Sequence, residues 1–118
     1  MPLRDAPVAV AKAELFKALG HPVRVRVLEV LVGGEVAVGE LADRLGIELS
    51  HLSQQLGVLR KADVVVARRA GTTVFYSLRD PRMSQLLVVA RELLLTGLKD
   101  RQSLLIDLEG ELAASSTP

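Results

Sequence analysis

The sequence predicts a mainly α-helical fold with one small β-hairpin, in the α+β class. Three consecutive patterns carry this prediction: a short helix that stops at Gly46, a second helix over residues 49–62, and two strand-like segments over residues 64–67 and 74–78. Two helices joined by a tight turn and followed by a strand–turn–strand unit are typical of a winged helix-turn-helix. We therefore expect a DNA-binding protein.

Two helices are predicted before this unit. Residues 8–19 are rich in alanine, place apolar side chains near helical spacing and stop at Gly20. Residues 23–32 carry an apolar stripe between charged positions, and Pro22 fits the first helical position because a proline needs no amide partner there. His21 precedes that proline, where a local capping or packing role is expected to outweigh metal binding.

The first helix of the helix-turn-helix is short. Residues 36–38 read as a short strand, and residues 39–45 form a helix of about two turns with its leucines inward. Gly46 is the expected C-terminal stop, since glycine tolerates the left-handed conformation that ends many helices.

The predicted helix over residues 49–62 has two unlike faces. At about 100° per residue, the four leucines 49, 52, 56 and 59 share one side. The opposite arc is short and polar, and it consists of Ser50, Ser53, Gln54, Gly57 and Lys61. An arc of this kind fits a major groove, where serine and glutamine can hydrogen-bond to base edges.

Four further features of this helix bear on the same interpretation. Arg60 and Lys61 are placed to meet phosphates, and His51 lies at the edge of the arc, where it contacts DNA or is simply solvated. Gly57 is costly in mid-helix and is expected to mark the close approach of another backbone. Taken alone, the whole pattern also fits an ordinary amphipathic surface helix.

The hairpin forms the wing. Its strands are rich in β-branched and aromatic residues, and residues 70–72 supply the turn. Arg68, Arg69, Thr72 and Thr73 near the tip are expected to straddle phosphates or reach the minor groove. The alternative is an arginine-tipped hairpin that only keeps its edge soluble.

The C-terminal segment predicts a dimer. Residues 81–98 read as a helix whose apolar side chains cover more than one face, so it needs a second surface. That surface is a second copy, with the first helix contributing, or else the core of a monomer. A helical extension to about Leu112 follows, so that residues 1–113 form one domain and residues 114–118 a disordered tail.

Composition narrows the class of protein. The 118 residues carry a net charge of only +1, but residues 44–79 hold six basic against two acidic residues. With no cysteine there is no disulfide or thiolate chemistry. Because no apolar run is long enough to span a membrane, we expect a soluble cytoplasmic protein that needs no membrane partner.

These segments together resemble the ArsR/SmtB family of small winged-helix repressors, over about residues 12–96. The stretches that carry the resemblance are residues 16–31, 38–46, 50–65 and 68–78. The resemblance implies a homodimer that binds a pseudo-palindromic operator until an effector lowers its affinity for DNA. It maps the reader positions onto Ser50, His51, Ser53, Gln54 and Gln55, with Gln55 replacing a common histidine.

The effector is not identified by any motif. The family's paired cysteines correspond here to Ala37 and Gly39, and of its C-terminal-helix metal ligands only Asp80 survives, with Arg82 in a neighbouring ligand place. A weak or atypical nickel or zinc site, a protein co-regulator, a small organic ligand and no effector at all stay open.

The sequence contains no pattern typical of an enzyme. It has no glycine-rich phosphate loop and no convincingly spaced nucleophile and base, so we expect no catalytic activity. The competing function is a winged-helix module that binds a protein instead of specific DNA. Whether the protein represses or activates, and at which genes, is not encoded in these patterns.

Overall fold

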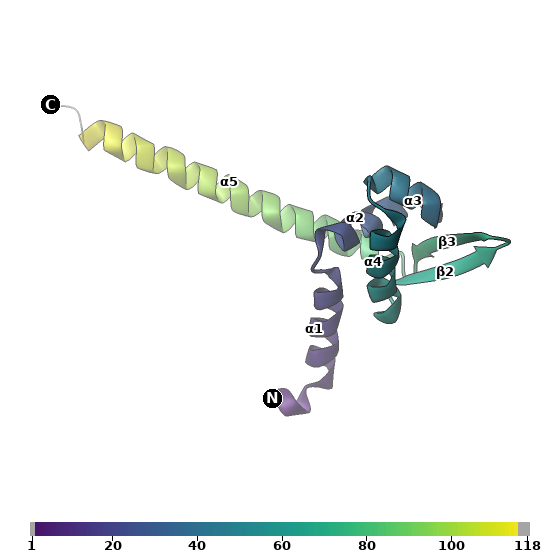
Figure 1. Ribbon diagram of the computed structural model, residues 1–118. Helices are drawn as coiled ribbons and strands as arrows, with labels where there is room; N and C mark the ends of the chain where they lie inside the picture. The colour runs from purple at the N-terminus through teal and green to yellow at the C-terminus, as the bar shows by residue number, and fades with distance from the viewer. Residues whose placement is uncertain (1, 116–118) are drawn as a thin grey trace. The chain divides into compact units, whose positions relative to one another are not determined.

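The computed structural model describes residues 2–115, which form two compact units that meet between Ser84 and Gln85. The first unit contains all the elements before the last helix (Figure 1). In chain order these are η1 (Leu3–Asp5), α1 (Pro7–Leu19), α2 (Pro22–Leu31), β1 (Val36–Ala37), α3 (Val38–Leu45), α4 (Leu49–Lys61), β2 (Val65–Ala70) and β3 (Thr73–Leu78). The short 3-10 helix η1 was not predicted.

The beginning of α2 confirms the local role expected for His21. The backbone N–H of Val23 donates to Nδ1 of His21 at 3.1 Å, so the imidazole satisfies one of the free amides at the helix start. Pro22 occupies the first turn, where its missing N–H costs nothing. The start of α2 therefore has the N–H of Val23 paired and no N–H at Pro22.

The helix-turn-helix consists of α3 and α4. Gly46 adopts a φ of 65°, as predicted for a left-handed stop, and the N–H of Ile47 donates back to the carbonyl of Ala42 at 3.2 Å. Val38 was predicted in a strand but begins α3, so the strand before it is only two residues long. The turn is thus set by local hydrogen bonds.

Leucines from α2, α3 and α4 make up most of the core of the first unit. The largest fully buried side chains are Val27, Leu28, Leu31, Leu41, Leu52, Leu56 and Leu59. The predicted inward position of Leu49 is wrong: its side chain is 52% exposed, because it opens α4 beyond the reach of the core. Three buried leucines therefore anchor α4 along one face.

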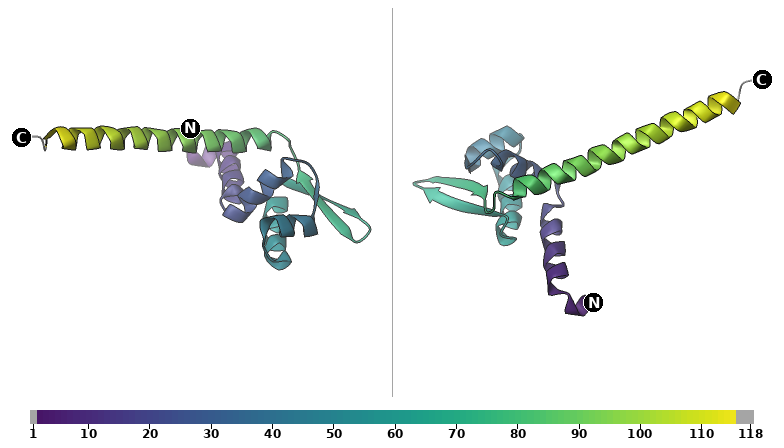
Figure 2. Two further views of the ribbon diagram at one scale, coloured as in Figure 1. Left: turned by 90° about the horizontal axis from the view of Figure 1, so that it is seen from above. Right: turned by 180° about the vertical axis from the view of Figure 1, so that it is seen from behind.

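The hairpin is longer and tighter than predicted. β3 pairs antiparallel with both β1 and β2, and the β2–β3 ladder continues to the pair Ala70 and Thr73. Only Gly71 and Thr72 remain in the turn, where Gly71 adopts a φ of 62° that suits a residue without a Cβ. Both views in Figure 2 show the hairpin extending beyond α3 and α4.

The last helix, α5 (Met83–Ser115), is continuous where the sequence predicted a helix followed by an extension. Gly97 and Gly110 lie within it without ending it. The predicted tail begins too early, since residues 114 and 115 are helical, and residues 116–118 lie outside the described part of the chain. None of the described helices is both long and apolar enough to cross a membrane.

Candidate nucleic-acid interface

The polar arc of α4 is exposed as a group. Ser50, His51, Ser53 and Gln54 all lie on the surface, whereas Leu52 and Leu56 on the other face are buried. The face carries hydroxyl, amide and imidazole groups and no carboxylate, so it offers hydrogen bonds without repelling phosphate. An α-helix with such a face can fit into the major groove of B-DNA.

Gln55 does not share this exposure. Its side chain is half-buried, and its Oε1 accepts a hydrogen bond from Nη1 of Arg24 on α2 at 3.3 Å. The structure therefore brings Gln55 against a neighbouring helix and separates it from the four exposed residues that were predicted with it. Arg24 also donates to the carbonyl of Lys17 at 3.4 Å, so it links three helices.

His51 is held at the edge of the arc by a second histidine. Its ring lies 6.2 Å from that of His21, centroid to centroid, at an interplanar angle of 82°. This edge-to-face contact joins the start of α2 to the first turn of α4. The described residues contain no group of three His, Cys, Asp or Glu side chains placed to hold a metal ion.

Gly57 lies in open space. A Cβ at this position would meet no atom of the described residues within 4 Å, so the expectation that it marks the close approach of another backbone is wrong for the described part of the chain. The glycine leaves the centre of the polar arc without a side chain. Arg60 and Lys61 follow it as exposed cations, and neither forms an ion pair within the described residues.

The two wing arginines differ in their partners. Arg68 donates from Nε and Nη2 to the carboxylate of Glu35, at 3.1 and 2.6 Å, and its guanidinium lies 4.7 Å from the ring centroid of Phe75. The hydrogen bonds from Arg68 lower the pKa of Glu35 below its ordinary value. Arg69 is exposed and has no ion pair within the described chain, and Thr72 and Thr73 are exposed at the tip.

Asp80, the surviving acidic residue of the family's metal motif, is engaged by Arg82. The Arg82 side chain donates from Nε at 3.1 Å and from Nη2 at 2.7 Å, and its backbone N–H donates at 2.9 Å. These hydrogen bonds lower the pKa of Asp80 to about 2. The guanidinium thus neutralises this carboxylate.

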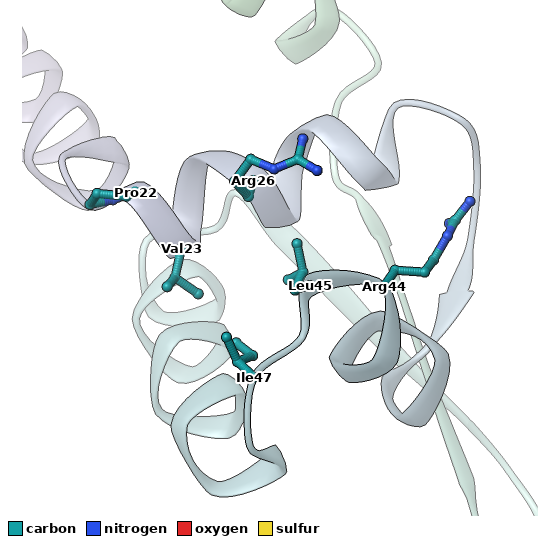
Figure 3. Close-up of a pocket in the computed structure, with 6 residues that line it drawn as sticks. All are labelled: Pro22, Val23, Arg26, Arg44, Leu45 and Ile47. Atoms are coloured by element: carbon teal, nitrogen blue, oxygen red, sulfur yellow. The ribbon is translucent and has the colours of Figure 1, made fainter.

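A small pocket lies beneath the turn between α3 and α4. It measures about 180 Å³, and in Figure 3 Val23, Leu45 and Ile47 gather between α2 and the turn while Arg44 extends away from them. Its lining is mainly apolar, with Arg26 and Arg44 as its two charged residues, and it indicates a gap in the packing around the turn. It supplies no convergent polar groups for a ligand.

Sequence reasoning did not assign Arg24 and Glu35 a role at this surface. Arg24 belongs to the second predicted helix, and its partner Gln55 lies 31 residues further along the chain. Glu35 lies 33 residues before Arg68. A charged residue beside an apolar stripe was visible in the sequence, but its partner was not, because each pairing depends on tertiary contacts.

Comparison with known proteins shows the family. A helix-turn-helix domain family matches residues 19–68. The uncharacterized HTH-type transcriptional regulator Rv0081 of Mycobacterium tuberculosis is 50% identical over 107 residues, which cover 90% of this chain and 94% of that protein. Its crystal structure superimposes with a TM-score of 0.74 over 80% of this chain and 96% of that one, at 52% identity.

Two further structures are similar. The crystal structure of the transcriptional repressor BigR from Xylella fastidiosa has a TM-score of 0.68 and 40% identity, over 79% of this chain and 96% of that one. A homodimeric winged helix-turn-helix DNA-binding domain from Mycobacterium bovis, described as a possible ArsR-family regulator, has a TM-score of 0.73 and 28% identity over 85% and 93% of the two chains. The chain belongs to the ArsR/SmtB family of winged helix-turn-helix transcriptional regulators.

Proposed function

We propose that this protein is a homodimeric repressor that binds a pseudo-palindromic operator in the cytoplasm. The observation that carries the proposal is the exposed, uncharged polar face of α4. It belongs to the same compact unit as the wing, whose Arg69 forms no ion pair within the described residues. One surface offers hydrogen bonds to bases and the other offers charge to phosphates, and sequence-specific binding requires both.

The residues at this surface have two roles, contact with bases and contact with phosphates. Ser50, Ser53 and Gln54 read base edges in the major groove, and His51 contacts the edge of the site. Arg60, Lys61, Arg69, Thr72 and Thr73 meet the phosphate backbone. Gln55 and Arg68 position α4 and the wing and do not contact DNA directly, because their side chains are hydrogen-bonded to Arg24 and Glu35.

The homodimer is supported by apolar surface on the first and last helices. In α1, Val8 and Phe16 are 65% and 58% exposed, and in α5 Leu93 and Leu94 are 69% and 68% exposed. Apolar side chains in such numbers are typical of an interface. A twofold axis would separate the two α4 helices by about 34 Å, one turn of B-DNA.

Fluorescence anisotropy tests the proposal directly. The full chain is titrated against the DNA upstream of its own coding sequence and against a scrambled duplex, across a salt series. We expect selective binding whose logarithmic salt slope corresponds to about six phosphates, or about −5. Nickel and zinc are added in parallel, since a metal-dependent change in affinity would point to an atypical metal site.

Equal affinity for the two duplexes at every salt concentration would contradict the proposal. It would favour a winged-helix module that binds a protein, or a regulator that needs a co-regulator to find its site. Arg26→Gln is a control for the general effect of removing one positive charge. Arg26 is an exposed cation on α2 that pairs with Glu29 and lies outside the proposed surface. This variant should bind as the parent does.

A further inference from the structure

A groove of about 460 Å³ lies between α1, α2 and the end of α4. We call it the α1–α4 groove. Glu14 and Lys17 from α1, Arg24 from α2 and Lys61 from α4 contribute its charged groups, and Ala18, Val58 and Ala62 contribute its apolar lining. Its volume is in the range of small-molecule sites. The three cations outnumber the one carboxylate, so the groove favours an anion.

The hydrogen bonding of Arg24 is incomplete. Its Nε is buried and has no hydrogen-bond partner among residues 2–115, and its two hydrogen bonds go to the uncharged oxygens of Gln55 and of the Lys17 backbone, at 3.3 and 3.4 Å. A guanidinium has five N–H donors, and buried donors are usually satisfied. Arg24 therefore has unused capacity for a strong acceptor.

The other charges of the groove are also uncompensated. No ion pair within the described residues involves Glu14, Lys17, Arg24 or Lys61. Val58 is 40% exposed and provides apolar surface beside these charges. Cationic groups next to a small apolar surface suit a molecule with one acidic group and a compact apolar body.

We propose that the α1–α4 groove binds a small organic anion, carrying one carboxylate or phosphate group, and that the bound anion changes the affinity of the protein for DNA. The anion is a stronger acceptor than the amide of Gln55, so it draws the guanidinium of Arg24 towards itself. Gln55 belongs to α4 and is next to Gln54, so this exchange reaches the reading face directly. The second half of the inference rests on the proposed DNA-binding function, whereas the first half does not.

Binding is tested on the full-length protein without DNA. Benzoate and phenyl phosphate serve as probes, and benzamide serves as the uncharged control with the same ring. Two-dimensional amide NMR of isotope-labelled protein should show benzoate or phenyl phosphate shifting the signals of residues that line the groove. Benzamide should bind at least about tenfold more weakly, because it lacks the charge. Absence of any shift at the groove with both anions overturns the proposal.

Two variants locate the site. Arg24→Gln and Lys17→Gln should each weaken anion binding about tenfold, the effect of losing one charge-assisted hydrogen bond. Lys17 is exposed, so its replacement keeps the test valid even if Arg24→Gln fails to fold. Lys12→Gln, an exposed lysine of α1 that does not line the groove, is the control and should bind as the parent does. Equal binding by all three variants overturns the assignment.

The charged groups of the groove could instead contact the phosphates of DNA. The salt series distinguishes a free anion from DNA phosphate as the ligand of the groove. If Lys17→Gln lowers the magnitude of the salt slope by about 0.9 and the free anions shift no groove signals, the groove is a backbone contact and the proposal is overturned. Anion binding together with weaker DNA affinity in the presence of anion supports both halves. Anion binding by a protein that selects no DNA supports the groove and contradicts only the proposed function.

Discussion

The helix α4 and the β2–β3 wing are neighbours in the chain but are built on different principles. α4 is anchored by three fully buried leucines and presents serine, glutamine and histidine on its free face. The wing has few buried side chains beyond Val65 and Tyr76, and its outer part carries two arginines. Positions that read bases need fixed geometry, whereas positions that attract phosphates tolerate movement because charge acts over distance.

The comparison predicts the largest loss of stability for the three buried leucines that anchor α4. Leu56→Ala should lower the free energy of unfolding by about 2–5 kcal/mol, because it removes apolar contacts and leaves a cavity. Val66→Ala in the wing, where the side chain is 36% exposed, should cost less than about 1 kcal/mol. Urea denaturation of both variants measures the difference, and equal losses would mean that the wing is as much a part of the core as α4.

The second prediction concerns sequence discrimination. Gln54→Ala should reduce the preference for the native duplex over a scrambled one by about 1–3 kcal/mol, the value of one good side-chain contact to a base. Ser77→Ala, a half-buried polar position of β3, should leave discrimination intact. Competition anisotropy measures both. If Gln54→Ala retains the full preference, the exposed arc of α4 is not the reading face.

The third prediction separates the two wing arginines. Arg69→Ala should lower the magnitude of the salt slope of DNA binding by about 0.9, as expected for one phosphate contact. Arg68→Ala should weaken binding chiefly because it exposes the charge of Glu35 to the DNA, so adding Glu35→Gln should restore part of the affinity. Anisotropy across a salt series distinguishes them. No recovery in the double variant would make Arg68 a direct phosphate contact.

The smallest effect is expected at Asp80. Its pKa is lowered to about 2 in the folded chain from 3.8, so its contribution to stability is present above about pH 4 and is lost as the pH falls towards 2. Asp80→Asn should therefore be slightly less stable than the parent at pH 7, and the gap should close on acidification. Thermal melts at pH 7 and at low pH measure this gap. Asp43→Asn, an exposed carboxylate of α3, is the control, and an identical pH trend there would contradict the assignment to the Arg82 contact.

Local signals made most of the fold predictable, and tertiary pairing explains what was missed. Gly46 and His21 fulfilled their predicted roles because helix stops and caps depend on nearby backbone. The wing arginines were found by their position after the second helix, but the engagement of Arg68 by Glu35 was not visible, since 33 residues separate the two. The exposed residues of α4 followed from helical periodicity, and so did the partial burial of Gln55, which lies about 60° from Leu52 on the packed side of the helix. Its hydrogen bond from Arg24 was not visible, because it depends on where α2 lies.

The paired ladder of the wing constrains how related proteins can vary in length. Arg68 and Arg69 are consecutive in β2, where successive side chains face opposite sides, and the ladder is regular up to a two-residue turn. Inserting one residue in β2 before Arg68 would turn both arginines to the opposite face, so that Arg68 no longer faces Glu35. Evolution can therefore extend this wing most easily by adding residues in pairs, one pair to each strand, so that every arginine keeps its side.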